Sequence, residues 1–135
     1  MKKVVDKSLS EDGSELNHKA YGIGAKLFSE GSFKSAKNEF KLALEYWPED
    51  PESWLALGNC FDELNKPKKA EECFRKALMF CSEKKEPDIY FNLGNSLFDQ
   101  SRYNEAIECY QKVTTQSTTY AVAQINLKKA KDRLS

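Results

Sequence analysis

Several features that would mark a membrane protein, a secreted protein or a nucleic-acid binder are missing from this sequence of 135 residues. No apolar run approaches the ~18 residues that span a bilayer, and the amino terminus reaches Asp6 before a signal-peptide core could form. The 21 basic residues balance 21 acidic ones, so the total charge does not indicate a surface for nucleic acid. We therefore expect no membrane insertion and no nucleic acid as a partner.

Patterns that hold metals or carry out catalysis are also scarce. The four cysteines, at positions 60, 73, 81 and 109, form no C-x-x-C pair and have no histidine beside them, so zinc-site spacings are absent. The one histidine, His18, has no cysteine-based or serine-based arrangement near it in the sequence. All four cysteines stand among apolar residues, where a thiol behaves as a small buried hydrophobe. We predict reduced thiols, a cytoplasmic location, no cofactor or metal, and no enzymatic activity.

What the sequence does contain is one pattern written three times. Gly24, Gly58 and Gly94 are separated by 34 and 36 residues. The same intervals separate three alanines and the three aromatic residues that follow them by four positions: Ala36, Ala70 and Ala106, then Phe40, Phe74 and Tyr110. The pattern divides the chain into repeats at residues 17–50, 51–86 and 87–120.

The spacing inside each repeat predicts two helices. In the second repeat, Trp54, Leu57 and Phe61 recur at intervals of three and four residues, which places them on one helical stripe. A break at residues 65–67 precedes a second stripe with the same period. Asp50 is predicted to cap the first helix, and prolines 51, 67 and 87 suit the first turn of a helix, where their missing N–H costs nothing. Each repeat is therefore predicted to be a helical hairpin.

These residues resemble the tetratricopeptide repeat, whose pattern W-x2-L-G-x2-Y, A-x3-F and P returns every 34 residues. The matching residues of the second repeat are Trp54, Leu57, Gly58, Phe61, Ala70, Phe74 and Ala77. Departures from the pattern are Ala20, Pro67, Ser82 and Thr118. The resemblance implies an all-α superhelix, a solenoid of three helical hairpins followed by a capping helix.

The two ends of the chain have different predicted roles. Residues 121–134 are interpreted as the capping helix that covers the last hairpin, with these apolar residues: Val122, Ile125, Leu127, Ala130 and Leu134. Residues 1–16 are rich in Ser, Asp, Glu and Lys, and are predicted to be a flexible segment. The first helix is expected to start between Ser8 and Asn17, and the repeat domain is expected to cover residues 17–135.

The resemblance also implies a function in binding, because similar repeats hold an extended peptide or a partner helix on a concave face lined by first helices. The sequence does not show which face is concave. The predicted groove residues are Tyr21, Phe28, Leu55, Asn59, Asp62, Asp88, Phe91, Asn95, Phe98 and Asp99. Amides suit a peptide backbone, the apolar residues suit apolar side chains, and the aspartates favour Lys or Arg. The predicted partner is a protein or peptide that is apolar with basic residues.

Some members of the family hold a peptide's terminal carboxylate with lysine, arginine and asparagine side chains. The matching positions here are Tyr21, Ala25, Ala56, Asp88 and Asn92. Only Asn92 is of a suitable type, and the charge of Asp88 would repel a carboxylate. A carboxylate-terminated tail is therefore not the expected ligand.

The sequence leaves several binding roles open. The first is an adaptor or assembly scaffold. The second is a small cytosolic chaperone resembling the translocator chaperones of bacterial type III secretion, although this chain lacks their longer amino-terminal dimerising helices. Self-association through an exposed end of the array, giving a homo-oligomer, is a third.

Overall fold

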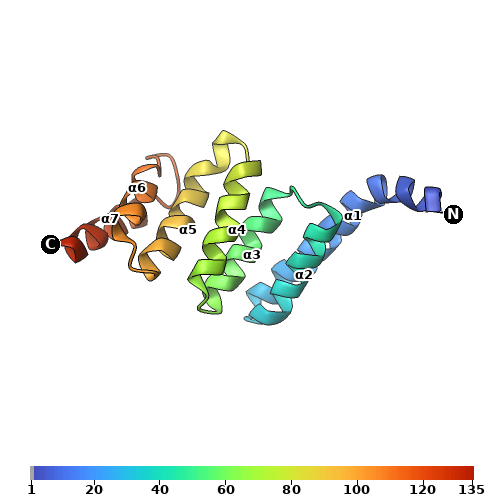
Figure 1. The fold of residues 1–135 in the computed structure, drawn as a ribbon, viewed down its shortest axis with the longest axis horizontal. Helices are drawn as coiled ribbons and strands as arrows, with labels where there is room; N and C mark the ends of the chain where they lie inside the picture. The colour runs from blue at the N-terminus through green and yellow to red at the C-terminus, as the bar shows by residue number, and fades with distance from the viewer. Residues whose placement is uncertain (1) are drawn as a thin grey trace.

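The computed structural model describes residues 2–135, with side chains described from Gly13 onward. In that part of the chain the elements are seven α-helices and one 3-10 helix, η1, and no strand: α1 (Lys2–Ser29), α2 (Phe33–Tyr46), α3 (Pro51–Glu63), α4 (Pro67–Phe80), η1 (Glu83–Lys85), α5 (Glu86–Asp99), α6 (Tyr103–Gln111) and α7 (Tyr120–Leu134). The helices form a row from one end of the chain to the other (Figure 1). The predicted all-α solenoid is confirmed.

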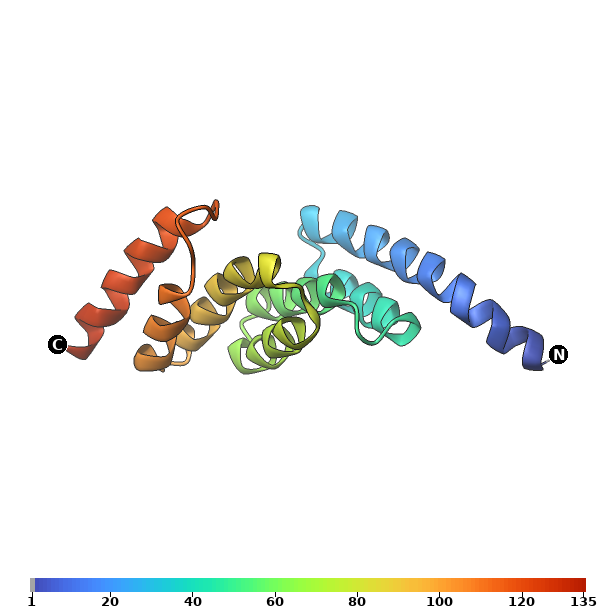
Figure 2. The ribbon, with the colours of Figure 1, turned by 90° about the horizontal axis from the view of Figure 1, so that it is seen from above.

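Consecutive helices pack as hairpins, α1 with α2, α3 with α4 and α5 with α6, and α7 packs on α6. Helix α1 also contacts α3, α3 contacts α5 and α5 contacts α7, whereas no contact joins α2 to α4 or α4 to α6 in the described chain. Elements on the inside of a curved stack lie closer together than those on the outside. The inner helices, α1, α3, α5 and α7, therefore line the concave side, and the outer helices are α2, α4 and α6 (Figure 2).

The repeated glycines allow the two helices of each hairpin to pack closely. A Cβ atom added at Gly58 would lie 2.5 Å from Cε1 of Phe74, which is shorter than any real contact. The same relationship joins Gly24 to Phe40 and Gly94 to Tyr110, each at 2.7 Å. Because any side chain would push the aromatic ring away, glycine and the ring sixteen positions later form one packing unit in all three repeats.

A buried hydrogen-bonded cluster joins the first two repeats. Asp50 caps α3 as predicted, since its Oδ1 accepts a hydrogen bond of 3.1 Å from the backbone N–H of Glu52. Oδ2 of Asp50 accepts from the hydroxyl of Ser53 and, at 3.2 Å, from the side-chain amide of Asn17. Asn17 also donates to the carbonyl oxygen of Ala43, at 2.9 Å. The cap thus holds α1, α2 and α3 together.

A charged cluster joins the second and third repeats. Glu71 of α4 is buried, and its carboxylate accepts from Nη1 of Arg102 at 2.7 Å and from Gln100 at 3.0 Å. Arg75, one turn further along α4, lies 2.9 Å from the same carboxylate. Arg102 also pairs with Glu105, at 2.8 Å. Two repeats are therefore fastened by an ion pair whose partners come from both.

The amino-terminal helix begins earlier than the sequence predicts. Helix α1 starts at Lys2, not between Ser8 and Asn17. Residues 2–12 contain neither Pro nor Gly, so nothing stops the helix from extending by one hydrogen bond per residue. Gly13, the first residue whose burial is described, is buried beside the carbonyl oxygen of Tyr46. That residues 1–16 form a flexible segment stays a prediction, and the side chains of residues 2–12 lie outside the described residues.

Helix α7 occupies the place of the predicted capping helix, but it packs with a different face. Ala123 and Ala130 are fully buried, whereas Val122, Ile125 and Leu134 are exposed. Small residues let α7 lie close to α6, so the contact face consists of the two alanines and the half-buried Leu127, which packs against the core as predicted. The choice of Val122, Ile125 and Leu134 as buried residues was therefore wrong.

The first repeat differs from the others in one apolar position. Ile23 is 43% exposed, whereas the equivalent Leu57 and Leu93 are 4% and 1% exposed. Leu57 and Leu93 are covered by the helices of the repeat before them, and within the described chain no repeat covers Ile23.

None of the helices in the described residues is long and apolar enough to cross a membrane.

Candidate functional site

All ten predicted groove residues lie on the inner helices. Helix α1 carries Tyr21 and Phe28, α3 carries Leu55, Asn59 and Asp62, and α5 carries Asp88, Phe91, Asn95, Phe98 and Asp99. Asp88 and Asp99 are exposed and the other eight are half-buried. We call this surface the concave groove. It contains three separate hollows that hold eight of the ten residues, and that hold neither Asp62 nor Phe91.

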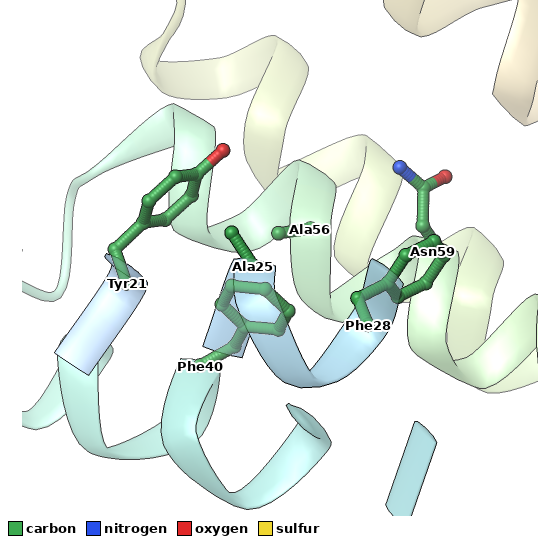
Figure 3. Close-up of a pocket in the computed structure, with 6 residues that line it drawn as sticks. All are labelled: Tyr21, Ala25, Phe28, Phe40, Ala56 and Asn59. Carbon is green, nitrogen blue, oxygen red and sulfur yellow. The ribbon is translucent and has the colours of Figure 1, made fainter. Parts of the chain in front are cut away.

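The first hollow lies between the first and second repeats and has a volume of about 160 Å³. Figure 3 shows the rings of Tyr21 and Phe28 and the amide of Asn59 around it, with the small side chains of Ala25 and Ala56 between them. Since two alanines leave space where larger residues would fill it, the hollow is open and mostly apolar. An apolar side chain could be received there, next to an amide that can bind its backbone.

The two predicted asparagines differ in how much hydrogen-bonding capacity they have left. Oδ1 of Asn95 accepts hydrogen bonds from the hydroxyl of Tyr110, at 2.6 Å, and from the amide of Asn126, at 3.0 Å. The second repeat has Phe74 in place of Tyr110 and therefore no hydroxyl there. Within the described chain the side chain of Asn59 makes no hydrogen bond. Asn59 is thus available as both donor and acceptor, and Asn95 as donor alone.

The three predicted aspartates are also unequal. Oδ1 of Asp62 is buried and has no hydrogen-bond partner in the described chain. Burial, then the negative charges of Asp99 and Glu63, raise the pKa of Asp62 to about 7. Burial also raises the pKa of Asp99. Asp88 instead accepts a hydrogen bond of 2.7 Å from the hydroxyl of Ser117. Neither Asp62 nor Asp99 forms an ion pair among the described residues, although Lys129 lines the same hollow as Asp99.

The groove aromatics are held at one edge by other rings. Phe28 meets Phe33 edge-on with ring centres 5.0 Å apart, and Phe98 meets Tyr103 in the same way at 5.1 Å. The guanidinium group of Arg133 lies 5.3 Å from the centre of the Phe98 ring. Rings fixed in this way lose little freedom when a ligand binds, which favours affinity.

Sequence reasoning missed three residues that shape the groove. Phe40 of α2 lies under the first hollow. Lys85 forms an ion pair of 2.8 Å with Glu52 beside the second hollow, whose volume is about 210 Å³ and which includes Leu55 and Asp88. Asn126 lines the third hollow, of about 320 Å³. Asn126 lies one helical turn before Lys129, which lines the same hollow, and no sequence pattern linked Lys85 to Glu52.

The cysteines and the one histidine differ in how far they are buried. Burial raises the pKa of Cys60 and Cys109 to about 11 and that of Cys73 to about 12, so these thiols stay protonated at neutral pH. Cys81 is half-buried, and His18 is exposed. Among the described side chains no group of three His, Cys, Asp or Glu residues is placed to hold a metal ion.

Comparison with known families places the repeats. Two family profiles described as tetratricopeptide repeat match residues 27–80 and 87–116, which together are more than half of the chain. The chain belongs to the tetratricopeptide repeat family. The resemblance inferred from the sequence is confirmed, including the second and third repeats whose glycines and aromatics carried it.

Similar proteins share the repeat over part or all of their length. The general transcriptional corepressor ssn6 of Schizosaccharomyces pombe is 30% identical over an alignment of 93 residues, and the match covers 64% of this chain and 8% of that protein. This tetratricopeptide repeat chain therefore spans a small fraction of that relative.

Two solved structures show the same arrangement of helices. The first tetratricopeptide repeat domain of Spaghetti (RPAP3), bound to the HSP90 peptide SRMEEVD, has a TM-score of 0.81 and 19% identity, with 90% of this chain and 94% of that chain covered. PcrH in complex with the chaperone binding region of PopD has a TM-score of 0.78 and 16% identity, with 87% and 92% covered. At these identities the likeness concerns the fold.

Proposed function

We propose that this chain is a non-catalytic protein-interaction module that binds a peptide segment or a partner helix in its concave groove, and that it acts as an adaptor or assembly scaffold. The observation that carries the proposal is the first hollow. There, rings of one repeat and an amide of the next surround an apolar space, and the amide of Asn59 has no partner in the described chain. The Spaghetti and PcrH structures, each with a bound polypeptide, support the proposal.

The chemistry of the groove suggests the character of the ligand. An apolar side chain enters the first hollow, the ligand backbone exchanges hydrogen bonds with Asn59, and a Lys or Arg lies against Asp62 and Asp99. Desolvation raises the pKa of both carboxyl groups, and a nearby cation would favour the charged form of each. The proposed partner is therefore a protein segment that is apolar with basic residues.

A cytosolic chaperone is the second candidate. Its support is the similarity of fold to PcrH, whose structure contains the chaperone binding region of PopD. The two roles differ in the state of the partner. A chaperone holds an unfolded apolar protein, which would be lost to aggregation without it, and an adaptor holds a protein that is folded by itself. For both candidate roles, adaptor and chaperone, the proposed location is the cytoplasm.

Affinity capture from the native lysate, with a groove variant and a matched control, tests the proposal. Leu55→Asp places a charge in the concave groove, and Met79→Asp makes the same change on outer helix α4, where Met79 is 67% exposed. We expect Met79→Asp to retain the wild-type partner and Leu55→Asp to lose it, with both variants equally helical by circular dichroism.

Binding to a synthetic segment of the captured partner gives the quantitative test. Asn59→Ala should weaken binding by about tenfold, because it removes a donor and an acceptor from the ligand backbone. Retention of the partner by Leu55→Asp, or an affinity within about twofold for Asn59→Ala, would assign the interaction to another surface.

A further inference from the structure

The outer side of the array contains a cleft of about 440 Å³ between α2 and α4. Its floor is formed by Trp54, Leu57 and Phe61 of α3, which are apolar. Its walls include Lys41 of α2 and Lys69 of α4. The cleft exists because α2 and α4 make no contact in the described chain, so the helix between them forms its base. We call it the outer cleft, and it lies on outer helices, away from the concave groove.

The walls of the outer cleft carry more positive than negative charge, since Lys41, Lys69 and Lys76 line it with one carboxylate, Glu72. Three further lysines lie nearby, because the charges of Lys34 and Lys66, like those of Lys41 and Lys69, act on Lys37. The six lysines are Lys34, Lys37, Lys41, Lys66, Lys69 and Lys76. None of the six forms an ion pair within the described residues. The pKa of Lys37 lies below its ordinary value through desolvation and the charges of its lysine neighbours. A chain with no net charge thus concentrates positive charge beside an apolar floor.

The equivalent junction one repeat later shows what the first junction lacks. Lys37 is 34 residues before Glu71, and Lys66 is 36 residues before Arg102, which are the intervals of the repeat. At the second junction, Glu71 and Arg102 form an ion pair of 2.7 Å. The first junction has two lysines at the same positions. A carboxylate that the chain supplies between its second and third repeats is therefore missing between its first and second.

We propose that the outer cleft is a second docking site, which binds an acidic amphipathic segment of a partner protein. An apolar side chain of the segment packs on the floor formed by Trp54, Leu57 and Phe61. Its Asp or Glu side chains lie between Lys37 and Lys66, in the place that Glu71 takes at the second junction. The proposal is independent of the concave groove and takes a ligand of opposite charge.

The floor of the cleft favours a protein segment over other polyanions. Phe61 is 6% exposed, and the amino group of Lys69 lies 5.7 Å from the centre of its ring. The amino group of Lys76 lies 5.8 Å from the ring of Trp54, whose indole N–H donates to the carbonyl oxygen of Pro48 at 2.7 Å. A lysine amino group lies over each ring, so a nucleotide base that stacked on this side of either ring would have to displace it. A flat anionic membrane would reach the lysines but not the recessed floor.

Fluorescence anisotropy with defined probes tests the proposal. The probe is a labelled helical peptide with leucines on one face and glutamates on the other. Two comparison probes separate the alternatives: the same peptide with serine for every leucine, and oligothymidine. We expect the leucine peptide to bind the full chain about tenfold or more tightly than either comparison probe, because only it uses both the floor and the walls.

Lys37→Glu gives a result that a purely structural role would not give. The new carboxylate faces Lys66 as Glu71 faces Arg102, so the melting temperature should rise while affinity for the leucine peptide falls by about tenfold. Lys131→Glu on α7 makes the same charge change elsewhere and should leave affinity unchanged. Leu55→Asp, which blocks the concave groove, should also leave it unchanged, so that the two binding sites are tested separately.

Four results would overturn the proposal. These are no binding of the leucine peptide to the wild-type chain, equal binding of the serine peptide or oligothymidine, equal losses for Lys37→Glu and Lys131→Glu, and unchanged affinity in a folded Lys37→Glu variant. If Leu55→Asp fails to capture the partner and none of these four results is found, the defect lies in the concave groove, and the proposal for the outer cleft stands.

Discussion

The hydroxyl of Tyr110 donates a hydrogen bond of 2.6 Å to Oδ1 of Asn95, and so joins the outer helix α6 to the inner helix α5 behind the groove. Phe74 occupies the equivalent position in the second repeat, where the equivalent asparagine, Asn59, has no such bond. The third repeat has this hydroxyl, so the protein itself binds the amide of Asn95. The second repeat lacks it, so the amide of Asn59 is free to bind a ligand.

Tyr110→Phe should lower the free energy of unfolding by about 1 kcal/mol, because it removes a buried hydrogen bond and leaves Asn95 with one donor fewer. Urea denaturation measures the change. Tyr46→Phe is the control, since the hydroxyl of Tyr46 makes no hydrogen bond in the described chain. Equal effects of the two changes would show that the bond to Asn95 contributes nothing specific.

Gly58→Ala should lower the free energy of unfolding by about 1–3 kcal/mol, because its Cβ would stand 2.5 Å from the buried ring of Phe74 and force the hairpin apart. Gly22→Ala is the matched control. Gly22 lies on the exposed side of α1 with no atom within 4 Å of an added Cβ, so alanine should stabilise the helix by up to about 1 kcal/mol. Thermal unfolding of the two variants should shift in opposite directions, and a shift in the same direction contradicts the close-packing account.

Glu71→Gln should lower the free energy of unfolding by about 1 kcal/mol at neutral pH, because it weakens a cluster that includes Arg102, Arg75 and Gln100. Burial raises the pKa of Glu71, but hydrogen bonds from Gln100, Arg75 and Arg102 outweigh it and lower the pKa overall. A lowered folded-state pKa gives stability that is present above the pKa of the unfolded chain and is lost as pH falls through the folded value. The difference between wild type and variant should therefore disappear in acid.

Glu72→Gln changes the neighbouring exposed residue, which forms no ion pair in the described chain, and serves as the control for Glu71→Gln. It should leave the urea midpoint unchanged at both pH values. A loss as large as that of Glu71→Gln, or a Glu71→Gln effect that persists in acid, would rule out the ion-pair explanation.

Asp62 should give the opposite pH dependence. Its folded-state pKa of about 7 lies above the ~3.9 of an unfolded aspartate, so the folded chain holds the proton more tightly between these values. The stability that this proton contributes is lost as pH rises through about 7. Asp62→Asn should be more stable than wild type at pH values above the folded pKa, and should approach it in acid. Melting temperatures over this range test the sign, with exposed Glu108→Gln as a control that shows no such trend.

The repeats were predictable because their determinants recur at fixed intervals. Gly58 and Phe74 belong to one packing unit. Because this unit occurs three times at fixed intervals, it can be recognised from the sequence alone. The cap at Asp50 and the helix start at Pro67 follow from chemistry within a few residues of sequence, and the structure confirms both. Curvature was not predictable, since it depends on which helices approach one another across repeats.

Partners that are distant in sequence account for what the sequence did not reveal. Ser117 bonds to Asp88 across 29 positions, and Lys85 pairs with Glu52 across 33, with no motif to connect them. In α7 two apolar stripes compete, and Ala123 and Ala130 form the buried face because α6 lies too close for larger residues. Lys37 belongs to no motif of the sequence, and only the structure places it near the charge of Lys66.

Outer helices that do not touch give the array two joints of different stiffness. The joint between α4 and α6 is locked by the ion pair of Glu71 and Arg102. The joint between α2 and α4 has lysines on both sides and no ion pair in the described chain, so the first two repeats are fastened on the inner side, through Asp50, and not on the outer side. A partner segment bound between α2 and α4 would set the angle between the first two repeats. It would thereby also set the width of the concave groove on the other side of the array.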